Sequence, residues 1–575
     1  MRFVRPSAFA HWGKVLVLLF AFALGLRLYG LGLIGLSSDE LNKLEASVSY
    51  RHGYFSVNNE HPMMLKAMVT GCVITAEKWN SYLHRRWPHK PWAQISPEAA
   101  VRFPAAVFGS ATAVALVYLG SLLFTPALGL CAGFLWASDI NIISINRVAK
   151  EETLAVFFLV LTVYFFMRGK DRPQHSPEAR RDYLLGGVSA GLLMGAWYLI
   201  IILLPLMVYY SVLQHRKDGW RIDRILGLKI LLIVIGTFLI SNPNVLSPEN
   251  IAHIKDYFLH RGVTHHGYFM LGKVFPNKAY YTLWGVPPYF YFLYLAIKFP
   301  IITLTAFLAG LCALLFKRDR NDKDLLLLIW FVTWSLLLMM PGGKFVRYIL
   351  TLMPVFVLIV AYGVLRAVGY LYRTLYRRPH PQYLYAVPLA TVMAFTYVFS
   401  PLAIVFNQFP HYGLFLNEIG SGFSRPGSVF PHCEYYDAGV RESMQYLCRV
   451  APRGAVVASE VVELCHFYSS YFGRKDLRFV RLSQILAARV GRREKVDLDY
   501  YLVQDGRKYF ENVRQFEYLQ RFRKPVFEYS IHGGTAIAVY RGDRQTNERI
   551  YNLPSVRPQD VWTLFEGTVY EPGRF

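Results

Sequence analysis

Long apolar runs separated by short polar connections dominate residues 1–405. A helix needs about twenty apolar residues to cross the hydrocarbon core of a membrane, and most of these runs approach that length. The run Leu184–Leu213 is too long for one span without steep tilt, so we expect two short helices with a break near Trp197–Tyr198. The other expected spans are Val15–Ile34, Ala99–Phe124, Leu128–Ile145, Thr153–Met167, Ile225–Ile240, Tyr289–Phe316, Leu325–Met340, Ile349–Val368 and Tyr385–Val405. The pattern predicts a polytopic α-helical membrane protein with about eleven transmembrane helices.

Basic residues predict how these helices are oriented. Loops rich in Lys and Arg usually face the cytoplasm, and the basic clusters of this chain all fall on one side of an eleven-span arrangement. These clusters are Arg2–Arg5, Arg168–Arg181, Arg216–Arg224, Lys317–Lys323 and Arg366–Arg378. We therefore expect a cytoplasmic N-terminus, with residues 35–98, 241–288 and 406–575 on the outer face. The first run lacks a small-residue cleavage site, so we expect a retained anchor rather than a signal peptide.

Beyond residue 405 the pattern becomes more polar. Short alternating segments predict strands at Gly454–Ser459, Tyr500–Gln504 and Ala536–Tyr540, with a helix at Gly439–Cys448. We therefore expect two domains, a transmembrane domain over residues 1–405 and an extracytoplasmic α/β domain over residues 406–575. The second contains Cys433, Cys448 and Cys465, an odd number that permits at most one internal disulfide.

Composition agrees with a membrane protein and narrows the partners. Hydrophobic residues make up 54% of the 575 residues and charged residues only 17%, which excludes a disordered chain or a small disulfide scaffold. The formal net charge is +24, from 62 Lys and Arg against 38 Asp and Glu. Nucleic acid is one explanation of such an excess. In a chain with so many spans we assign it instead to anionic membrane lipids and phosphorylated lipid substrates, and we expect no nucleic-acid partner.

The first outer loop carries the residues most suited to chemistry. Asp39 and Glu40 form an acidic pair directly after the first apolar run. Further along the loop, Glu60, His61 and Lys66 place an acid, an imidazole and an ammonium group within two helical turns. Ionisable groups at span ends on one face favour a functional site. A hydrated loop with ordinary salt bridges is the alternative explanation.

Two further outer turns carry charged residues. Arg147 and Glu152 follow the third apolar run, although an acid at the start of a helix is also a common capping preference. A turn with two glycines presents Lys344 and Arg347, followed by Tyr348, beside exposed backbone amides. Two cations and free amides form a competent phosphate site. Anchoring at the membrane interface is the alternative role for these two cations.

Taken together, these motifs resemble the GT-C glycosyltransferases. The acidic pair, the acid-His-Pro stretch that ends at Lys66, and Arg147 followed by Glu152 are similar to the protein O-mannosyltransferase group (glycosyltransferase family 39) and its bacterial relatives that depend on polyprenyl-phosphate sugars. Pro287–Tyr291, Lys298–Pro300 and the Arg347-Tyr348 pair also resemble that family, over roughly residues 12–405. Met63 stands where the family has a second proline, and Glu152 where it often has Asp. The sugar and the acceptor are therefore not implied.

The resemblance implies the GT-C fold and direct displacement, with inversion, of a sugar from a polyprenyl-phosphate carrier onto a hydroxyl of a protein, lipid or glycan. It makes Asp39 the general base, with Glu40 orienting the acceptor or holding Asp39 in place. The cations expected to bind the leaving phosphate are Arg347 and Lys344 first, then Lys66 and Arg147. Glu60 and His61 are expected to line the donor sugar or the acceptor groove. Some relatives use a divalent metal, for which Asp39, Glu60 and Glu152 are the candidate ligands, and others work without one.

Two other classes fit parts of the sequence. A transporter or flippase of a lipid-linked or anionic substrate would share the spans and the basic charge, but secondary transporters usually carry inverted repeats, and we find none. A scaffold or sensor with an outer ligand-binding domain would not require four charged loop motifs. We expect an integral protein of a bacterial inner membrane, with the C-terminal domain in the periplasm.

Overall fold

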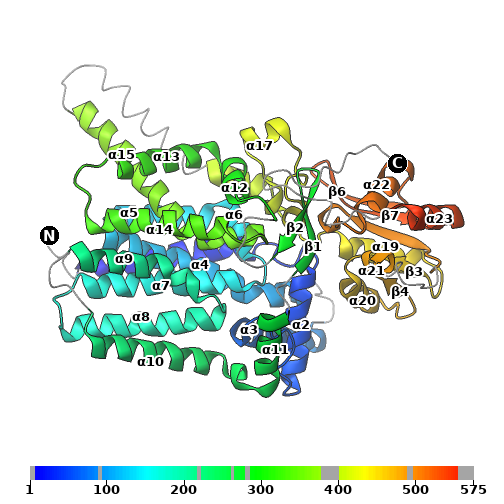
Figure 1. Cartoon of the computed structure of the whole chain (residues 1–575), viewed down its shortest axis with the longest axis horizontal. Coiled ribbons are helices and arrows are strands. Elements are labelled where there is room, and N and C mark those ends of the chain that lie inside the picture. The colour runs from blue at the N-terminus through cyan, green and yellow to red at the C-terminus, as the bar shows by residue number, and fades with distance from the viewer. Residues whose placement is uncertain are drawn as a thin grey trace.

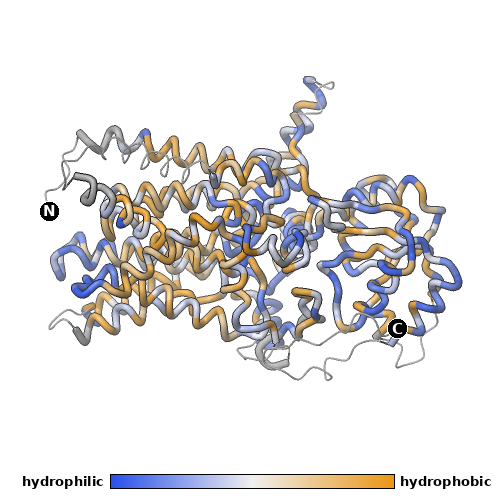
Figure 2. Tube along the Cα trace, turned by 90° about the horizontal axis from the view of Figure 1, so that it is seen from above, coloured by the Kyte–Doolittle hydropathy of each residue, from blue (hydrophilic) through white to orange (hydrophobic). Residues whose placement is uncertain are grey.

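The computed structural model describes residues 7–87, 93–216, 222–260, 264–278, 285–376, 400–487 and 496–554. Long helices lie side by side over most of the molecule, and a β-sheet with short helices lies at one end of them (Figure 1). Apolar residues concentrate along the long helices, whereas the sheet-bearing end is mixed in hydropathy (Figure 2). We refer to the described residues from 406 to 554 as the C-terminal α/β region.

The α-helices α1–α15 precede that region among the described residues. They are α1 (Ser7–Leu28), α2 (Ser38–Arg51), α3 (Met63–Arg86), α4 (Pro97–Leu123), α5 (Pro126–Ser138), α6 (Ile140–Asn146), α7 (Glu151–Lys170), α8 (Pro177–Ala196), α9 (Leu204–Arg216), α10 (Arg224–Ser241), α11 (Pro248–His260), α12 (Phe290–Lys298), α13 (Ile301–Leu315), α14 (Asp322–Met339) and α15 (Met353–Tyr376). The starts of α4, α5 and α8 share one local device: a Ser or Thr hydroxyl accepts a backbone N–H bond, and proline occupies the first turn. These starts are therefore encoded by a few neighbouring residues.

Several apolar runs are divided into shorter helices. The expected break near Trp197 is confirmed, because α8 ends at Ala196 and Trp197 is extended. The run Leu128–Ile145 is not one straight span: α5 and α6 meet at 63°, since the Asp139 side chain caps α6. The run Tyr289–Phe316 is likewise two helices, α12 and α13, separated at Pro300. The expected span Tyr385–Val405 lies mostly outside the described residues.

Four described helices are long and apolar enough to cross a membrane by themselves: α4, α7, α10 and the Met353–Tyr370 part of α15. The bent pair α5–α6 makes a fifth if it counts as one span. The prediction of a mainly helical membrane protein is thus confirmed, whereas the predicted number of about eleven spans is not.

Two of the basic loops meet at one end of the helices. Lys170, at the end of α7, lies 3.2 Å from Asp322, and Lys323 lies 2.8 Å from Asp171. Because α7 has 20 residues, this end lies about 30 Å from Glu151 at its start. The basic loops and the acidic start of α7 therefore occupy opposite ends of the helical part.

The C-terminal α/β region contains a five-stranded sheet in the order β4-β3-β5-β7-β6. Its strands are β3 (Val456–Ala458), β4 (Arg478–Val480), β5 (Tyr500–Gln504), β6 (Phe527–Ile531) and β7 (Gly534–Arg541). β3 pairs in parallel with β4 and β5, whereas β7 pairs antiparallel with β5 and β6. The strands predicted at Gly454–Ser459, Tyr500–Gln504 and Ala536–Tyr540 correspond to β3, β5 and β7.

The helices of this region are α17 (Glu418–Phe423), α18 (Pro431–Tyr435), α19 (Val440–Val450), α20 (Val462–Tyr471), α21 (Leu482–Ala487), α22 (Val513–Phe522) and α23 (Arg544–Asn552). The predicted helix Gly439–Cys448 corresponds to α19. A separate hairpin of β1 (Thr264–Met270) and β2 (Lys273–Lys278) precedes the region in sequence. All six cysteines are free thiols, so the optional disulfide among Cys433, Cys448 and Cys465 is not formed.

Candidate functional site

The N-terminus of α2 positions Asp39. Ser37 and Glu40 form a capping box, in which the Ser37 hydroxyl accepts a bond from the Glu40 backbone N–H and the Glu40 carboxylate accepts one from the Ser37 backbone N–H. Glu40 is fully buried and accepts two bonds of 2.7 Å from the guanidinium of Arg102 on α4. Glu40 therefore fixes the turn that carries Asp39.

Asp39 lies between two cations and a tyrosine. Its Oδ2 atom is 2.9 Å from Lys150 Nζ and 3.6 Å from Arg347 Nη1, and it accepts a 2.9 Å bond from the Tyr436 hydroxyl. Burial by itself would raise the pKa of Asp39, but Lys150 and Arg347 outweigh it and hold that pKa well below its usual value. The Asp39 side chain is still 32% exposed. Asp39 is therefore an ionised carboxylate open to a cavity.

Arg347 joins Asp39 to the start of α7. Its Nε atom donates a 3.0 Å bond to Glu152, and its guanidinium lies over the rings of Phe345 and Tyr348. The Arg347 Nη1 atom is buried and has no hydrogen-bond partner. A buried donor without a partner is costly, which favours an anionic ligand at this position.

A second ion cluster lies beside the first. Lys43 on α2 lies 2.5 Å from Glu151, and the His61 ring lies 3.6 Å from the same carboxylate. Burial is the main reason that the pKa of His61 lies well below its usual value, so this imidazole is neutral. His61 therefore borders the site as a neutral group.

The remaining predicted residues are held by other partners. Lys66 Nζ donates to the carbonyls of Val57, Asn58 and His61 at 3.2, 2.7 and 2.9 Å. Burial lowers its pKa to about 7. Glu60 is exposed and bonds to the Asn58 amide. Both residues organise the loop before α3 and lie outside the cluster around Asp39.

Arg147 and Lys344 are similarly engaged with backbone carbonyls. The Arg147 guanidinium donates to Arg27, Tyr29 and Gly30 at the end of α1. It also lies 5.1 Å from the centre of the ring of Tyr412. Lys344 Nζ donates to the carbonyls of Val286 and Pro341 and is 1% exposed.

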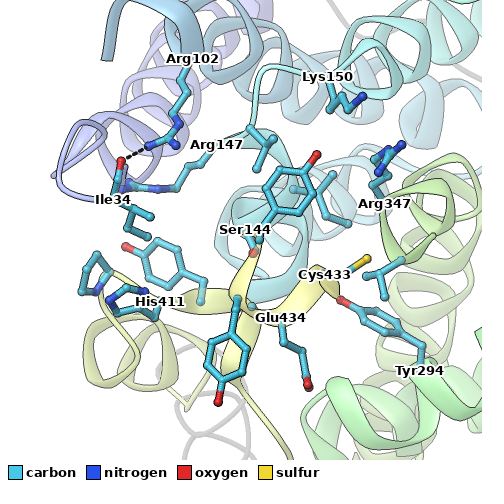
Figure 3. A pocket seen from close by; sticks show the side chains of 18 residues that line it. Ile34, Arg102, Ser144, Arg147, Lys150, Tyr294, Arg347, His411, Cys433 and Glu434 are labelled. Atoms are coloured by element: carbon cyan, nitrogen blue, oxygen red, sulfur yellow. Dashed lines mark hydrogen bonds between the residues drawn. The ribbon is translucent and has the colours of Figure 1, made fainter. Parts of the chain in front are cut away.

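Two cavities adjoin beside Asp39, which lines the second of them. The first contains roughly 940 Å³ of empty space including its mouth, and Figure 3 shows Arg102 and Arg147 on one side of it and Lys150 and Arg347 on the other. The second contains roughly 720 Å³ and is lined by the start of α2, the β1–β2 hairpin and the C-terminal α/β region. Arg347 and Tyr436 line both cavities. These two side chains therefore form the wall between them.

The candidate metal ligands do not form a set. Arg347 lies between Asp39 and Glu152, and Glu60 bonds to Asn58 in the loop. In the part of the chain that the structure describes, no three His, Cys, Asp or Glu side chains are close enough to hold a metal ion. Because cations neutralise Asp39 and Glu152, this donor set does not fit a divalent ion.

Three residues at the centre were not predicted from the sequence: Lys43, Lys150 and Tyr436. Lys150 lies between the two candidate residues Arg147 and Glu152 in the sequence, and this position could have marked it as a further candidate. Its side chain is only 2% exposed. This burial separates it from an ordinary surface lysine, but it is visible only in the folded structure. Tyr436 is 397 residues from Asp39 and carries no sequence signal for this contact.

Comparison with known proteins gives matches at two levels. Residues 92–241 match the model of a family described as dolichyl-phosphate-mannose-protein mannosyltransferase. No curated protein sequence matches the chain. Archaeal oligosaccharyltransferase AglB from Archaeoglobus fulgidus, in complex with an inhibitory peptide and a dolichol-phosphate, aligns with a TM-score of 0.50 at 12% identity, over 95% of this chain and 77% of that one.

Two further solved structures are similar. ArnT from Cupriavidus metallidurans, bound to undecaprenyl phosphate, aligns with a TM-score of 0.49 at 12% identity, over 92% of this chain and 98% of that one. The Pmt1–Pmt2 protein O-mannosyltransferase complex of S. cerevisiae, bound to its sugar donor, aligns with a TM-score of 0.32 at 16% identity, over 40% of this chain and 33% of that one.

The family model matched over residues 92–241 and the fold shared with AglB confirm the predicted resemblance: the chain is similar to the membrane glycosyltransferases of the GT-C type. Within that class it resembles the protein O-mannosyltransferase group, as the loop motifs predict.

Proposed function

We propose that the protein transfers a sugar from a polyprenyl-phosphate carrier to a hydroxyl acceptor on the outer face of the membrane, with inversion at the anomeric carbon. One observation carries the proposal: Asp39, the candidate base, lines the second of two adjoining cavities and is held by two cations, of which Lys150 lines the first cavity and Arg347 lines both. An inverting displacement needs the nucleophile and the leaving group on opposite sides of the reacting carbon, and two adjoining cavities suit that requirement.

The first cavity suits the donor. Its walls combine cations, among them Arg147, Lys150 and Arg347, with apolar side chains such as Ile145 and Val346. A phosphate needs the cations, and a polyprenyl tail needs apolar surface. The Arg347 Nη1 atom makes no hydrogen bond, although it lies 3.6 Å from Asp39, and it is the donor best placed for a phosphate oxygen. AglB, whose fold the chain shares, is a dolichol-phosphate complex, which supports this class of carrier.

The second cavity suits the acceptor. Asp39 and Ser38 line it at the start of α2, and Asn277, Tyr268 and Arg507 add polar groups on the other sides. An acceptor hydroxyl in this cavity would meet Asp39 from the side away from the donor phosphate. Asp39 then takes the hydroxyl proton while the acceptor oxygen bonds to the anomeric carbon. The bond between that carbon and the phosphate oxygen breaks, and the phosphate keeps the electron pair.

Lys150 and Arg347 have two successive roles in this scheme. Before the donor binds, they neutralise Asp39 and lower its pKa, which makes it a weak base. A phosphate that attracts these cations leaves Asp39 less neutralised and therefore more basic. At the transition state the same cations stabilise the charge that develops on the leaving phosphate. Donor binding would thus activate the base.

The proposed orientation places the N-terminus in the cytoplasm and the C-terminal α/β region outside, with about eleven spans. The basic loops around Lys170 and Lys323 support it, because they lie at the end of α7 away from Asp39. The proposed location is a bacterial inner membrane, which places the site in the periplasm.

The test is sugar transfer from a panel of radiolabelled polyprenyl-phosphate sugars, with membranes containing wild-type protein or Asp39→Asn and envelope extract as acceptor. We expect label to move from one donor with wild-type protein and to fall at least about 100-fold in the variant, because a general base contributes that much or more. Asp476→Asn, at an exposed carboxylate paired with Arg474, is the matched control and should retain full transfer. Full turnover by Asp39→Asn would remove Asp39 as the base. Failure of every donor with folded wild-type protein would favour the transporter alternative.

A further inference from the structure

Tyr436 is the one group from the C-terminal α/β region that bonds to Asp39 among the described residues. Its hydroxyl donates a 2.9 Å bond to Asp39 Oδ2, and its side chain lines both cavities. Burial, and next the negative charge of Asp39, place the pKa of Tyr436 well above its usual value, so the hydroxyl keeps its proton. Tyr436 therefore acts on Asp39 as an uncharged donor.

The backbone that presents Tyr436 is in an uncommon conformation. Tyr436 and Asp437 are both left-handed, with φ of 46° and 61°. Side chains other than glycine rarely adopt this region, and each such residue costs on the order of 1 kcal/mol or more. Two in succession persist only where surrounding contacts hold them.

Those contacts form a clasp between the C-terminal α/β region and the start of α2. Asp437 Oδ2 accepts bonds of 3.0 and 3.1 Å from the backbone N–H and the hydroxyl of Ser38. Arg507 donates through Nε and Nη2 to both oxygens of Asp437, at 2.9 and 2.5 Å, and through Nη2 to the Ser38 hydroxyl at 2.7 Å. Asp437 and Arg507 are thus tied to the residue next to Asp39.

We propose that Tyr436 is a positioning residue for Asp39, and that the clasp of Asp437, Arg507 and Ser38 holds Tyr436 against Asp39. The C-terminal α/β region then completes the active site. The inference rests on the proposed function of Asp39. It assigns chemistry to a part of the chain that carried no catalytic motif in the sequence.

A tyrosine suits position 436 because, in the proposed mechanism, a donor phosphate attracts Lys150 and Arg347 away from Asp39. Lys150, Arg347 and Tyr436 all contact the same oxygen of Asp39, Oδ2, which leaves Oδ1 to meet an acceptor hydroxyl. When a donor phosphate draws Lys150 and Arg347 away, a neutral hydroxyl has no comparable attraction to the phosphate and stays on Oδ2. Tyr436 then keeps Oδ1 directed at the acceptor without the strong loss of basicity that a cation causes.

The activity test compares Tyr436→Phe with wild-type protein. Phenylalanine keeps the ring and loses the bond to Asp39, so we expect kcat to fall about 10- to 100-fold, the range for one hydrogen bond to a charged group, while KM for donor and acceptor changes less than about twofold. Tyr501→Phe is the matched control, because it removes a buried hydrogen bond from Tyr501 on β5 to Asn547 on α23, away from Asp39, and should leave kcat unchanged. An equal kcat for Tyr436→Phe and wild type would overturn the proposal.

A double variant tests the clasp. Arg507→Met should also lower kcat, and Tyr436→Phe combined with Arg507→Met should be no slower than Arg507→Met alone, because both act through one contact. Arg481→Met, which breaks the exposed pair with Glu463, is the matched arginine control. Losses that multiply in the double variant would show that Arg507 does not act through Tyr436.

A thermal measurement separates this inference from the proposed function. In purified full-length protein, the Tm losses of Tyr436→Phe and Asp39→Ala should be less than additive when combined, since the two changes remove the same hydrogen bond. Additive losses would overturn the inference whatever the activity. A wild-type protein that transfers no sugar but shows this coupling would count against the proposed function alone.

Discussion

At the residue scale, the centre of the protein is a balanced set of buried and half-buried ions. Lys43, Lys150 and Arg347 alternate with Asp39, Glu151 and Glu152, and every one of them contacts an opposite charge. Burying ions without partners is strongly unfavourable, so this pairing keeps the site stable before any substrate binds. An anionic donor changes the balance. In the proposed mechanism the cations nearest Asp39 therefore determine both donor binding and the basicity of the carboxylate.

Lys150→Met is expected to move the acidic limb of the pH profile. Lys150 is the nearest cation to Asp39, so its loss raises the pKa of Asp39, and the base is then lost at a higher pH as the solution is acidified. The measurement is kcat/KM against pH, because this ratio reports ionisations of the free enzyme. Arg347 and Tyr436 remain in contact with Asp39, so the shift is partial.

Lys78→Met, at an exposed position on α3, is the control for that profile and should not move the acidic limb. An acidic limb at the same pH in Lys150→Met and wild type would show that Lys150 does not influence the base.

At the element scale, the loop before α3 depends on one lysine. Lys66 lies in the first turn of α3 and bonds back to three carbonyls of the preceding loop, where Asn58 is left-handed. Three carbonyls that point at one ammonium group would be left without a partner if the lysine were removed. The loop holds His61 near Glu151, so its order also affects the border of the active site.

Below pH 7, where Lys66 with its pKa of about 7 is charged, Lys66→Met should therefore destabilise the protein by about 3 kcal/mol, because charged hydrogen bonds are worth roughly 1.5–3 kcal/mol each and part of that is recovered by relaxation. Chemical denaturation of the purified protein measures it. Binding of undecaprenyl phosphate by the folded variant should stay within about twofold of wild type, since Lys66 lines neither cavity. A stable variant with weak binding would instead assign Lys66 to the donor.

At the scale of the whole molecule, the proposed active site lies where two parts of the chain meet. The helical part supplies Asp39, Lys150 and Arg347, and the C-terminal α/β region supplies Tyr436. The basic loops lie at the opposite end of α7. This separation is what an enzyme needs when positive loops remain in the cytoplasm and the chemistry takes place outside.

A reporter fused after Phe575 should read as external, and one fused before Met1 as cytoplasmic, because the positive loops hold the other end of the helices inside. Paired fusions of alkaline phosphatase and of green fluorescent protein measure this, each being active on one side only. A cytoplasmic signal after Phe575 would contradict the proposed orientation and place Asp39 on the wrong side for an outer-face reaction.

The sequence by itself determined the local features. The helix break at Trp197 and the strands β3, β5 and β7 were readable because apolar periodicity acts within a few residues. The loop motifs likewise identified Asp39, Glu152 and Arg347, which the fold brings together. Local patterns failed where a single apolar run bends, as at Asp139 and Pro300.

Only the tertiary structure decided how the charges are partnered. Glu40, Lys66, Arg147 and Lys344 resemble site residues in the sequence, but each is held by a buried ion or by carbonyls that become neighbours only on folding. Tyr436 approaches Asp39 across 397 residues. A contact of that separation depends on the packing of the whole chain, because no local pattern specifies which distant side chain will fill the space beside a buried carboxylate.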